Sequence, residues 1–362
     1  MRNVWIVLSF IYAASLQVMQ AETPVIRLVS PAGFVKGEFE TKGQYLVLKQ
    51  MNRLLRVKAD CSGTDDLCAL PESRISTGCN LHFYEGTIYI AHDQGIYAVM
   101  AESGKWSKVP TGLDIISILG ISSNNLLNVM SATIGGNASG SDILNAIWAI
   151  DCNGKGRLLQ RNNLHPIADA CYCAENSFAV ASGNAIDLYS PDLKWRKQIK
   201  VSGPIVDMVG LSSCRFIVRI RHANRDSIVN TENAVETKIA DGKYIMGVGG
   251  GRVVAIRDDN AVVVLSKAME WLEIMRLENA DMDVSASFWG QPKVSLDGRY
   301  VCLRIGTVGK KGDASKILQW GLVIDLEGHL YRTIDLSFEE ACWVRQEKTG
   351  DTHQTQRVSS DK

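Results

Sequence analysis

A twelve-residue pattern recurs along this chain and limits what it can fold into. Asn184 to Trp195 and Asn260 to Trp271 both begin with Asn-Ala and end with Trp, and six of the twelve positions are identical or aliphatic replacements. Gly95 to Trp106 has the same length and the same closing Trp. Each copy predicts a strand, a polar turn and a second strand opened by an aromatic residue. Since such a hairpin cannot bury its apolar face alone, the copies must pack on one another.

A second repeated feature, a six-residue apolar strand, allows the repeating units to be counted independently of the twelve-residue pattern. Seven six-residue strands each follow a turn residue: Gln44 to Lys49, Thr87 to His92, Asn125 to Met130, Ser177 to Ser182, Arg215 to Ile220, Arg252 to Arg257 and Arg299 to Arg304. The corresponding units are 33–74, 75–110, 113–161, 165–200, 203–238, 240–277 and 282–337. Four short strands per unit and a period near forty residues are typical of a β-propeller blade.

We therefore predict an all-β fold, a β-propeller of seven four-stranded blades. A sandwich has no reason to repeat about every forty residues, and a parallel β-helix repeats at much shorter intervals. The segments Val25 to Val29 and Phe338 to Val344 lie outside the seven units, and either can supply a strand that closes the ring. Six or eight blades therefore remain open.

Composition and charge exclude some classes of function. The 362 residues are 46% apolar and 22% charged, which is ordinary for a globular protein with a large core. The 39 Lys and Arg residues equal the 39 Asp and Glu residues, so no overall field attracts nucleic acid or an anionic membrane. We predict no nucleic-acid partner.

The amino terminus resembles a secretory signal. Arg2 is followed by an apolar run from Val4 to Val18 and by small residues up to Ala21, and this run is short for a membrane span. We predict a signal peptide over 1–21, a propeller domain over 22–345 and a disordered tail over 346–362. The expected location is secreted or periplasmic, with no integral membrane segment after removal of the signal.

Nine cysteines in an exported chain permit disulfides. Cys61 and Cys68 flank a turn-like insert, and we predict that they form a disulfide. Zinc-binding, nucleotide-binding and hydrolase motifs are absent, so we predict no metal and no cofactor, and a catalytic residue cannot be assigned.

Two blades resemble known repeats. Tyr97 to Trp106 resembles the Tyr-Ala-Leu-Asp-x-x-Thr-Gly-x-x-x-Trp pattern of pyrroloquinoline-quinone-type propellers, in which the Trp docks against the next blade, although Met100 replaces the Asp. The same residues resemble the Asp-box of sialidase-like propellers, again without the Asp. Trp289 to Tyr300 resembles the blade opening of Tol-type and other WD-like exported propellers, with Leu296 in place of a Pro. These resemblances imply the superfamily and no particular member.

Aligning the second strands suggests a candidate binding surface. Lys49, His92, Arg257 and Arg304 occupy the same position at the far end of their strands. Equivalent positions of successive blades lie on one rim of a propeller, so these cations are candidates for binding a negatively charged ligand. The competing interpretation is that they are solvated strand ends, which often carry charges.

We therefore expect an exported, monomeric binding or scaffold module that engages a protein or an anionic or saccharide ligand through one face. The alternative is a lactonase-like hydrolase or lyase with its site at the mouth of the channel. Asp114, Asp169 and Asp207, which open first strands in neighbouring blades, are its candidate residues. Asp is also common at strand starts for reasons of turn chemistry.

Overall fold

The structure is a computed structural model of the whole chain. It describes residues 26–346, apart from 73–80, 93–94, 114, 122–126, 135–142, 152, 163–166, 173–176, 191, 213, 224, 280–283 and 310–318. The predicted signal peptide lies outside the described residues, and so does the predicted tail except for its first residue.

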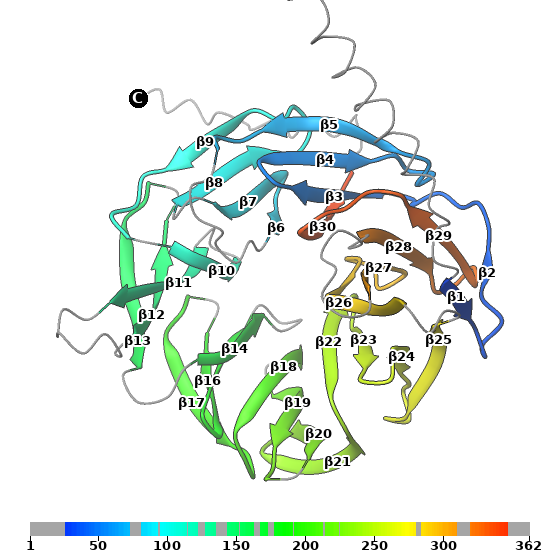
Figure 1. Ribbon diagram of the computed structural model, residues 1–362. Coiled ribbons are helices and arrows are strands. Elements are labelled where there is room, and N and C mark those ends of the chain that lie inside the picture. The colour runs from blue at the N-terminus through cyan, green and yellow to red at the C-terminus, as the bar shows by residue number, and fades with distance from the viewer. Residues whose placement is uncertain are drawn as a thin grey trace, which may run out of the picture.

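The described strands form seven sheets that surround a central axis, and all their strand pairs are antiparallel except that of β2 with β29 (Figure 1). The fold is a β-propeller, as the sequence predicts, and the number of sheets equals the seven expected units. In the described part of the chain the only regular secondary structure is β-strand, joined by turns and bends.

Blades 1 to 4 each contain four strands, which are named from the axis outwards. Blade 1 contains β30 (Glu340–Arg345), β3 (Gln44–Gln50), β4 (Arg53–Val57) and β5 (Thr64–Ala69). Blade 2 contains β6 (Leu81–Tyr84), β7 (Thr87–His92), β8 (Gly95–Met100) and β9 (Trp106–Val109). Blade 3 contains β10 (Ile115–Ile121), β11 (Leu127–Ile134), β12 (Ile143–Ile150) and β13 (Gly156–Asn162). Blade 4 contains β14 (Ile167–Tyr172), β15 (Phe178–Ser182), β16 (Ala185–Tyr189) and β17 (Trp195–Lys200).

Blade 5 also has four strands, whereas blades 6 and 7 have five. Blade 5 contains β18 (Ile205–Ser212), β19 (Arg215–Arg221), β20 (Asp226–Glu232) and β21 (Val235–Asp241). Blade 6 contains β22 (Tyr244–Gly249), β23 (Arg252–Arg257), β24 (Ala261–Leu265), β25 (Trp271–Asn279) and β1 (Ile26–Val29). Blade 7 contains β26 (Val284–Val294), β27 (Tyr300–Gly309), β28 (Gln319–Asp325), β29 (Leu330–Ile334) and β2 (Val35–Lys36).

Both segments left outside the seven units take part in the sheets. Strand β30 pairs with β3 from Lys49↔Glu340 to Gln44↔Arg345, so the carboxyl-terminal strand completes blade 1 and closes the ring. Strand β1 adds antiparallel to β25, and β2 adds parallel to β29. The amino-terminal segment therefore covers the outer edges of blades 6 and 7 and does not form a further blade.

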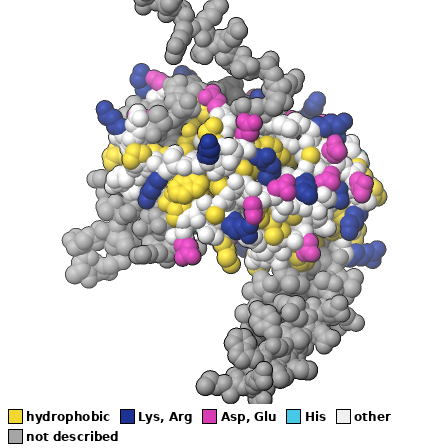
Figure 2. All heavy atoms as spheres, turned by 90° about the horizontal axis from the view of Figure 1, so that it is seen from above, with side chains coloured by type: hydrophobic (Ala, Val, Ile, Leu, Met, Phe, Trp, Pro, Cys, Tyr) yellow, Lys and Arg dark blue, Asp and Glu magenta, His cyan; other side chains and the backbone are white. Residues whose placement is uncertain are grey.

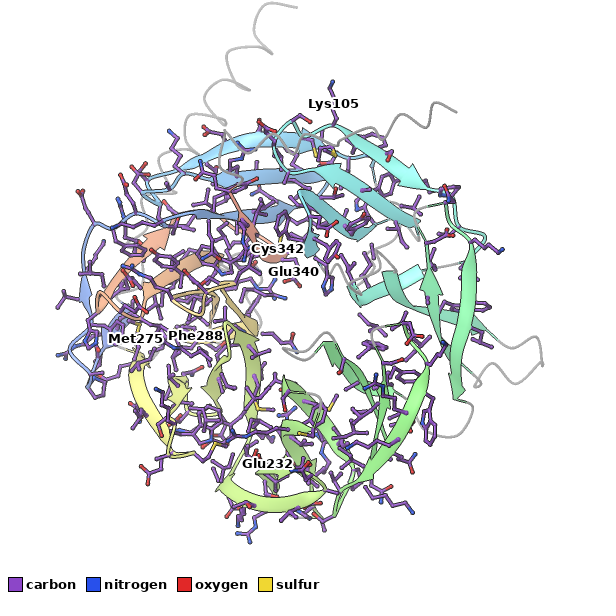
Figure 3. All side chains as sticks on the ribbon, turned by 180° about the vertical axis from the view of Figure 1, so that it is seen from behind. Lys105, Glu232, Met275, Phe288, Glu340 and Cys342 are labelled. Atoms are coloured by element: carbon purple, nitrogen blue, oxygen red, sulfur yellow. The ribbon has the colours of Figure 1, made fainter. Side chains whose placement is uncertain are left out.

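The core is divided among the interfaces between blades. Seven clusters of buried apolar side chains each join two neighbouring blades, and together they run once around the ring. Met275 of β25 and Phe288 of β26, for example, lie together between blades 6 and 7 (Figure 3). Second strands are buried on both faces, which explains their apolar runs. Outer strands such as β17 are mostly exposed.

The repeated Trp residues open the fourth strands, as predicted, but they do not all pack between blades. Trp271 stacks on Tyr244, with ring centroids 5.3 Å apart, against the cluster between blades 5 and 6. Trp106 is 42% exposed and Trp195 is 60% exposed. Trp106 still docks on the neighbouring blade, because its Nε1 donates to the carbonyl oxygen of Ala69 in blade 1 at 3.0 Å. Trp195 Nε1 instead donates to Asp187 of its own blade at 3.3 Å, so the expected packing between blades is wrong for Trp195.

No helix in the described part of the chain combines the length and apolar character that crossing a bilayer requires.

Candidate functional site

The second strands of all blades end on one side of the disc, which we call the upper face. Because neighbouring strands of each blade are antiparallel, the turns from second to third strands lie on this face. So do the connections that lead from the fourth strand of one blade to the first strand of the next. Lys49, His92 and Arg257 lie at or next to the ends of their second strands, as predicted. The predicted position is wrong for Arg304, because β27 continues to Gly309 and Arg304 lies within it.

Lys49 and Arg304 converge on the segment that enters the closing strand. Lys49 is 3% exposed and forms an ion pair with the carboxylate of Glu339. Arg304 Nη1 donates to the carbonyl oxygens of Glu339, at 2.8 Å, and Phe338, at 3.2 Å. One cation comes from blade 1 and the other from blade 7. Together they hold the entry to β30, so their contacts stabilise ring closure.

His92 and Arg257 lie in other blades and have their own partners. His92 is 2% exposed, and its Nε2 donates to the carbonyl oxygen of Pro71 at 2.8 Å. Arg257 Nη2 lies 2.7 Å from an oxygen of Asp259 and 2.9 Å from one of Glu273. The four cations therefore have separate partners and do not form one cluster in the described structure, and a role for them in ligand binding stays a prediction.

A small crevice of about 50 Å³ lies at the mouth of the channel between blades 7 and 1. Lys293 Nζ and Glu340 Oε1 form an ion pair across it at 2.6 Å, and Glu340 lies near the central axis (Figure 3). The guanidinium of Arg304 lies 5.9 Å from the centroid of the Trp289 ring. A side chain at Gly306 would meet that ring at 2.4 Å, so glycine is required there. The crevice is too small for an organic ligand.

Cys61 and Cys68 are free thiols in the structure, so the predicted disulfide is not formed. Cys61 packs in the cluster between blades 7 and 1, whereas Cys68 packs against the cluster between blades 1 and 2. The two sulfurs therefore face different neighbouring blades. Burial raises the pKa of each thiol to about 11, so both are protonated at neutral pH and are poor nucleophiles.

A much larger open cavity, of about 510 Å³, lies between blades 4 and 5 and extends along β21 from Glu236 to Asp241. Its walls come from the connection between the two blades, the turn from β19 to β20, and the strands β20 and β21. The lining residues are Ser202, His222, Ala223, Arg225, Ser227, Val229, Glu236, Lys238 and Asp241. Seven of these nine carry a polar or charged side chain, so the cavity offers many directional contacts.

The charges of this cavity are separated into two ends. At one end Lys238 Nζ lies 2.8 Å and Arg225 Nη1 lies 3.3 Å from the same oxygen of Asp241, so two cations share one carboxylate. The hydrogen bond from Lys238 lowers the pKa of Asp241. This end therefore has a net charge of +1.

At the other end the Glu236 carboxylate accepts hydrogen bonds from Ser202, at 2.7 Å from the backbone N–H and 2.8 Å from the hydroxyl. No cation is paired with Glu236 among the described residues. Between the two ends, His222 Nε2 and Ser227 Oγ form a hydrogen bond of 2.8 Å. The cavity thus presents a negative end, a positive end and neutral polar groups between them.

One sign of this site is visible in the sequence, although it matches no motif. Glu236 and Lys238 are two residues apart on β21, an outer strand. Arg225 comes earlier in the chain, in the turn between β19 and β20. A strand with acidic and basic residues at i and i+2 places both on one face. Nothing in the sequence shows that this face meets the turn from blade 4.

The candidate residues for a channel-mouth enzyme do not converge. Asp207 is buried, and its carboxylate accepts the backbone N–H of Met246 at 3.0 Å, between blades 5 and 6. Asp114 lies outside the described residues, as does the side chain of Asp169. Among the residues that the structure describes, no three His, Cys, Asp or Glu side chains are grouped as metal ligands.

Comparisons with known proteins give the fold and no closer relationship. No protein family and no curated protein sequence matches this chain. Among solved structures, a puromycin hydrolase shares 12% identity with a TM-score of 0.58. The alignment covers 85% of this chain and 54% of the hydrolase. A puromycin-hydrolyzing peptidase from Mycobacterium tuberculosis shares 10% identity with a TM-score of 0.58, and the alignment covers 86% of this chain and 55% of the peptidase.

A dihydro-heme d1 dehydrogenase, NirN, shares 13% identity with a TM-score of 0.50, and 88% of this chain and 79% of that chain are covered. This chain spans about half the length of the two hydrolases. At such low identity the likeness shows the β-propeller fold alone.

Proposed function

We propose that this chain is an exported binding module that holds a small ligand carrying both charges, such as a free amino acid or the end of a peptide. The observation that carries the proposal is the cavity between blades 4 and 5, in which Glu236 stands opposite the cluster of Arg225, Lys238 and Asp241. An ammonium group suits the unpaired carboxylate of Glu236. A carboxylate suits the end where two cations share one acid.

The size and lining of the cavity support this ligand class. About 510 Å³ falls within the range of about 300–1,000 Å³ that small-molecule sites usually have. No Trp, Tyr or Phe is among the described residues that line it, so these residues offer a sugar ring no flat aromatic face to pack on.

Isothermal titration with three related peptides tests the proposal. We expect L-alanyl-L-alanine to bind, and its N-acetyl and carboxamide derivatives, each lacking one charge, to bind about tenfold more weakly. The substitution Glu236→Gln should abolish the preference for the free amine and leave the preference for the free carboxylate. Lys238→Gln should weaken the preference for the free carboxylate.

Glu102→Gln and Lys105→Gln serve as matched controls, since they change one exposed acid and one exposed base in the turn between β8 and β9 of blade 2, far from blade 5 (Figure 3). Binding of the N-acetyl peptide as tight as that of the free dipeptide would identify a simple anion site. Failure of all three peptides to bind at millimolar concentration would refute the proposal.

Export is a separate part of the proposal and rests on the sequence of residues 1–21. Expression with and without this segment, followed by amino-terminal sequencing of the exported protein, checks it. We expect the mature chain to begin at Glu22. Retention of Met1 in the exported protein would contradict the predicted cleavage.

A further inference from the structure

The outer edge of blade 4 carries an unusual concentration of positive charge. Residues 194–200 read Lys-Trp-Arg-Lys-Gln-Ile-Lys, and they form β17 and the residue before it. Every residue of β17 except Ile199 is exposed, including Trp195 at 60%. Strand β5, the corresponding outer strand of blade 1, contains two acidic residues and no cation. The edge of the disc at blades 1 and 2 mixes both signs of charge (Figure 2).

Most of these cations lack a partner within the described part of the chain. Lys194 Nζ pairs with Asp192 at 2.8 Å, whereas no ion pair there involves Arg196, Lys197 or Lys200. The carboxylates nearby are Asp192 and Asp187, and Asp187 accepts hydrogen bonds from Trp195 and Gln198. Four cations against two carboxylates leave a local charge of +2 on a chain whose net charge is zero.

The edge also offers backbone groups for pairing. Strand β17 is the last strand of its sheet in the described structure, so one row of its N–H and C=O groups has no ladder partner. The fold shows what can occupy this position. In blade 6 the residues Ile26–Val29 pair antiparallel with β25, which is the fourth strand of that blade as β17 is of blade 4. A fourth strand of this propeller therefore accepts a fifth strand.

We propose that β17 is a docking site for an extended acidic segment of a partner protein, which adds to blade 4 as a fifth strand. Main-chain hydrogen bonds would hold the segment, and its carboxylates would meet the cations. The pairing of β17 with β16 is regular from Lys197 to Lys200, and a register shift falls at Arg196. Side chains alternate between the two faces of a strand, so Lys197 and Lys200, three positions apart, lie on different faces of the blade. Acidic side chains on both faces of the added strand therefore find a cation. The site is independent of the cavity between blades 4 and 5.

Fluorescence anisotropy of the full chain with a labelled probe tests the proposal. The probe is a peptide of about eight residues in which pairs of consecutive acids, Glu or Asp, alternate with pairs of Val or Thr, so that both faces of the strand carry carboxylates and the peptide is long enough to span β17. We expect it to bind at low salt and to weaken as salt is raised, because exposed charges are screened. The variant carrying Arg196→Gln, Lys197→Gln and Lys200→Gln should bind it about tenfold more weakly.

A second probe separates strand addition from simple charge attraction. It has the same sequence with every second backbone amide methylated, which keeps its charge and removes donors needed for a ladder. We expect it to bind at least about tenfold more weakly than the unmethylated peptide. The control variant, with Lys58→Gln and Lys105→Gln on blades 1 and 2, should bind both probes as the unchanged protein does.

Three outcomes would overturn the proposal. The triple variant binds the acidic peptide as tightly as the unchanged protein, or the unchanged protein does not bind it at low salt. In the third outcome, the methylated and unmethylated peptides bind equally and heparin displaces both. That result would identify β17 as a surface for polyanionic glycans and not for a peptide strand. Circular dichroism of each variant verifies that the fold is retained.

Discussion

Blades 4, 5, 6 and 7 share the same four-stranded plan, but the outer edges of blades 6 and 7 are covered by added strands and those of blades 4 and 5 are not in the described structure. The amino-terminal segment covers the first pair, with β1 on β25 and β2 on β29. Phe34, between those two strands, is buried in the cluster that joins blades 6 and 7. In the described structure β17 and β21 have no such cover. The covered pair adjoins the point where the ring closes.

Some of the charged residues follow the same division, although blade 5 also contains a buried acid with cationic partners, Asp226, which lies 3.4 Å from Arg221 and 3.8 Å from Arg219. In blade 7 Arg299 Nη2 lies 2.7 Å from the buried carboxylate of Asp325, and in blade 6 Arg257 pairs with two carboxylates. In blades 4 and 5 Glu236 faces the cavity without a cation and β17 carries unpaired cations. Charges that are neutralised within the protein stabilise it, whereas charges left without partners are available to a ligand. The comparison therefore assigns stability to one region and binding to the other.

The largest effect is expected from Asp325→Asn in blade 7. Asp325 is 1% exposed and accepts hydrogen bonds from Arg299 and from the backbone N–H groups of Glu327 and Gly328. Removing its charge leaves Arg299 without its buried partner, and we expect the free energy of unfolding to fall by about 3 kcal/mol. Urea denaturation at pH 7 measures the change.

The pH dependence of this variant provides a further check. Burial alone would raise the pKa of Asp325, but the hydrogen bonds from Arg299 lower it below its usual value. A lowered pKa contributes stability above the unfolded value of about 4 and loses it as the pH falls further. The difference between the unchanged protein and the variant should therefore shrink below about pH 4. Asp66→Asn, which disrupts an exposed pair in blade 1, should change stability by less than about 1 kcal/mol.

A pair of Trp substitutions at the same register compares blades 6 and 4 directly. Trp271→Ala removes a ring that stacks on Tyr244 and packs between blades, and it should cost about 3 kcal/mol. Trp195→Ala removes a mostly exposed ring and should cost less than about 1 kcal/mol. Thermal unfolding midpoints of the two variants, measured under the same conditions, compare the two losses of stability. Equal losses would show that the two blades are not packed differently.

The repeated pattern was sufficient to predict the fold because blade packing depends on local features. The three repeated Trp residues open fourth strands as expected, and the seven expected units correspond to the seven sheets. The burial of Trp195 between blades was predicted incorrectly. The reason is that a repeat shows which positions are equivalent, whereas burial also depends on what covers each blade.

The candidate site could not be predicted in the same way. The alignment of strand ends gave Lys49, His92, Arg257 and Arg304 the same position, but their partners come from elsewhere in the chain. Glu339, for example, is 290 residues from Lys49. The cavity between blades 4 and 5 likewise brings Ser202 to Glu236 through the packing of two blades. Contacts of this kind depend on the path of the connections between blades, which a repeat does not encode.

The smallest expected effect concerns Arg257, which tests whether a paired cation can also bind a ligand. The hydrogen bond to Asp259 raises the pKa of Arg257, and Glu273 provides a second carboxylate. Because the group is partly exposed and Arg276 also contacts both acids, Arg257→Gln should cost only about 1 kcal/mol. Binding of the dipeptide and of the acidic peptide should not change, as titration and anisotropy would show. If either peptide bound more weakly to this variant, Arg257 in blade 6 would take part in ligand binding. The division between stabilising blades 6 and 7 and binding blades 4 and 5 would then be incorrect.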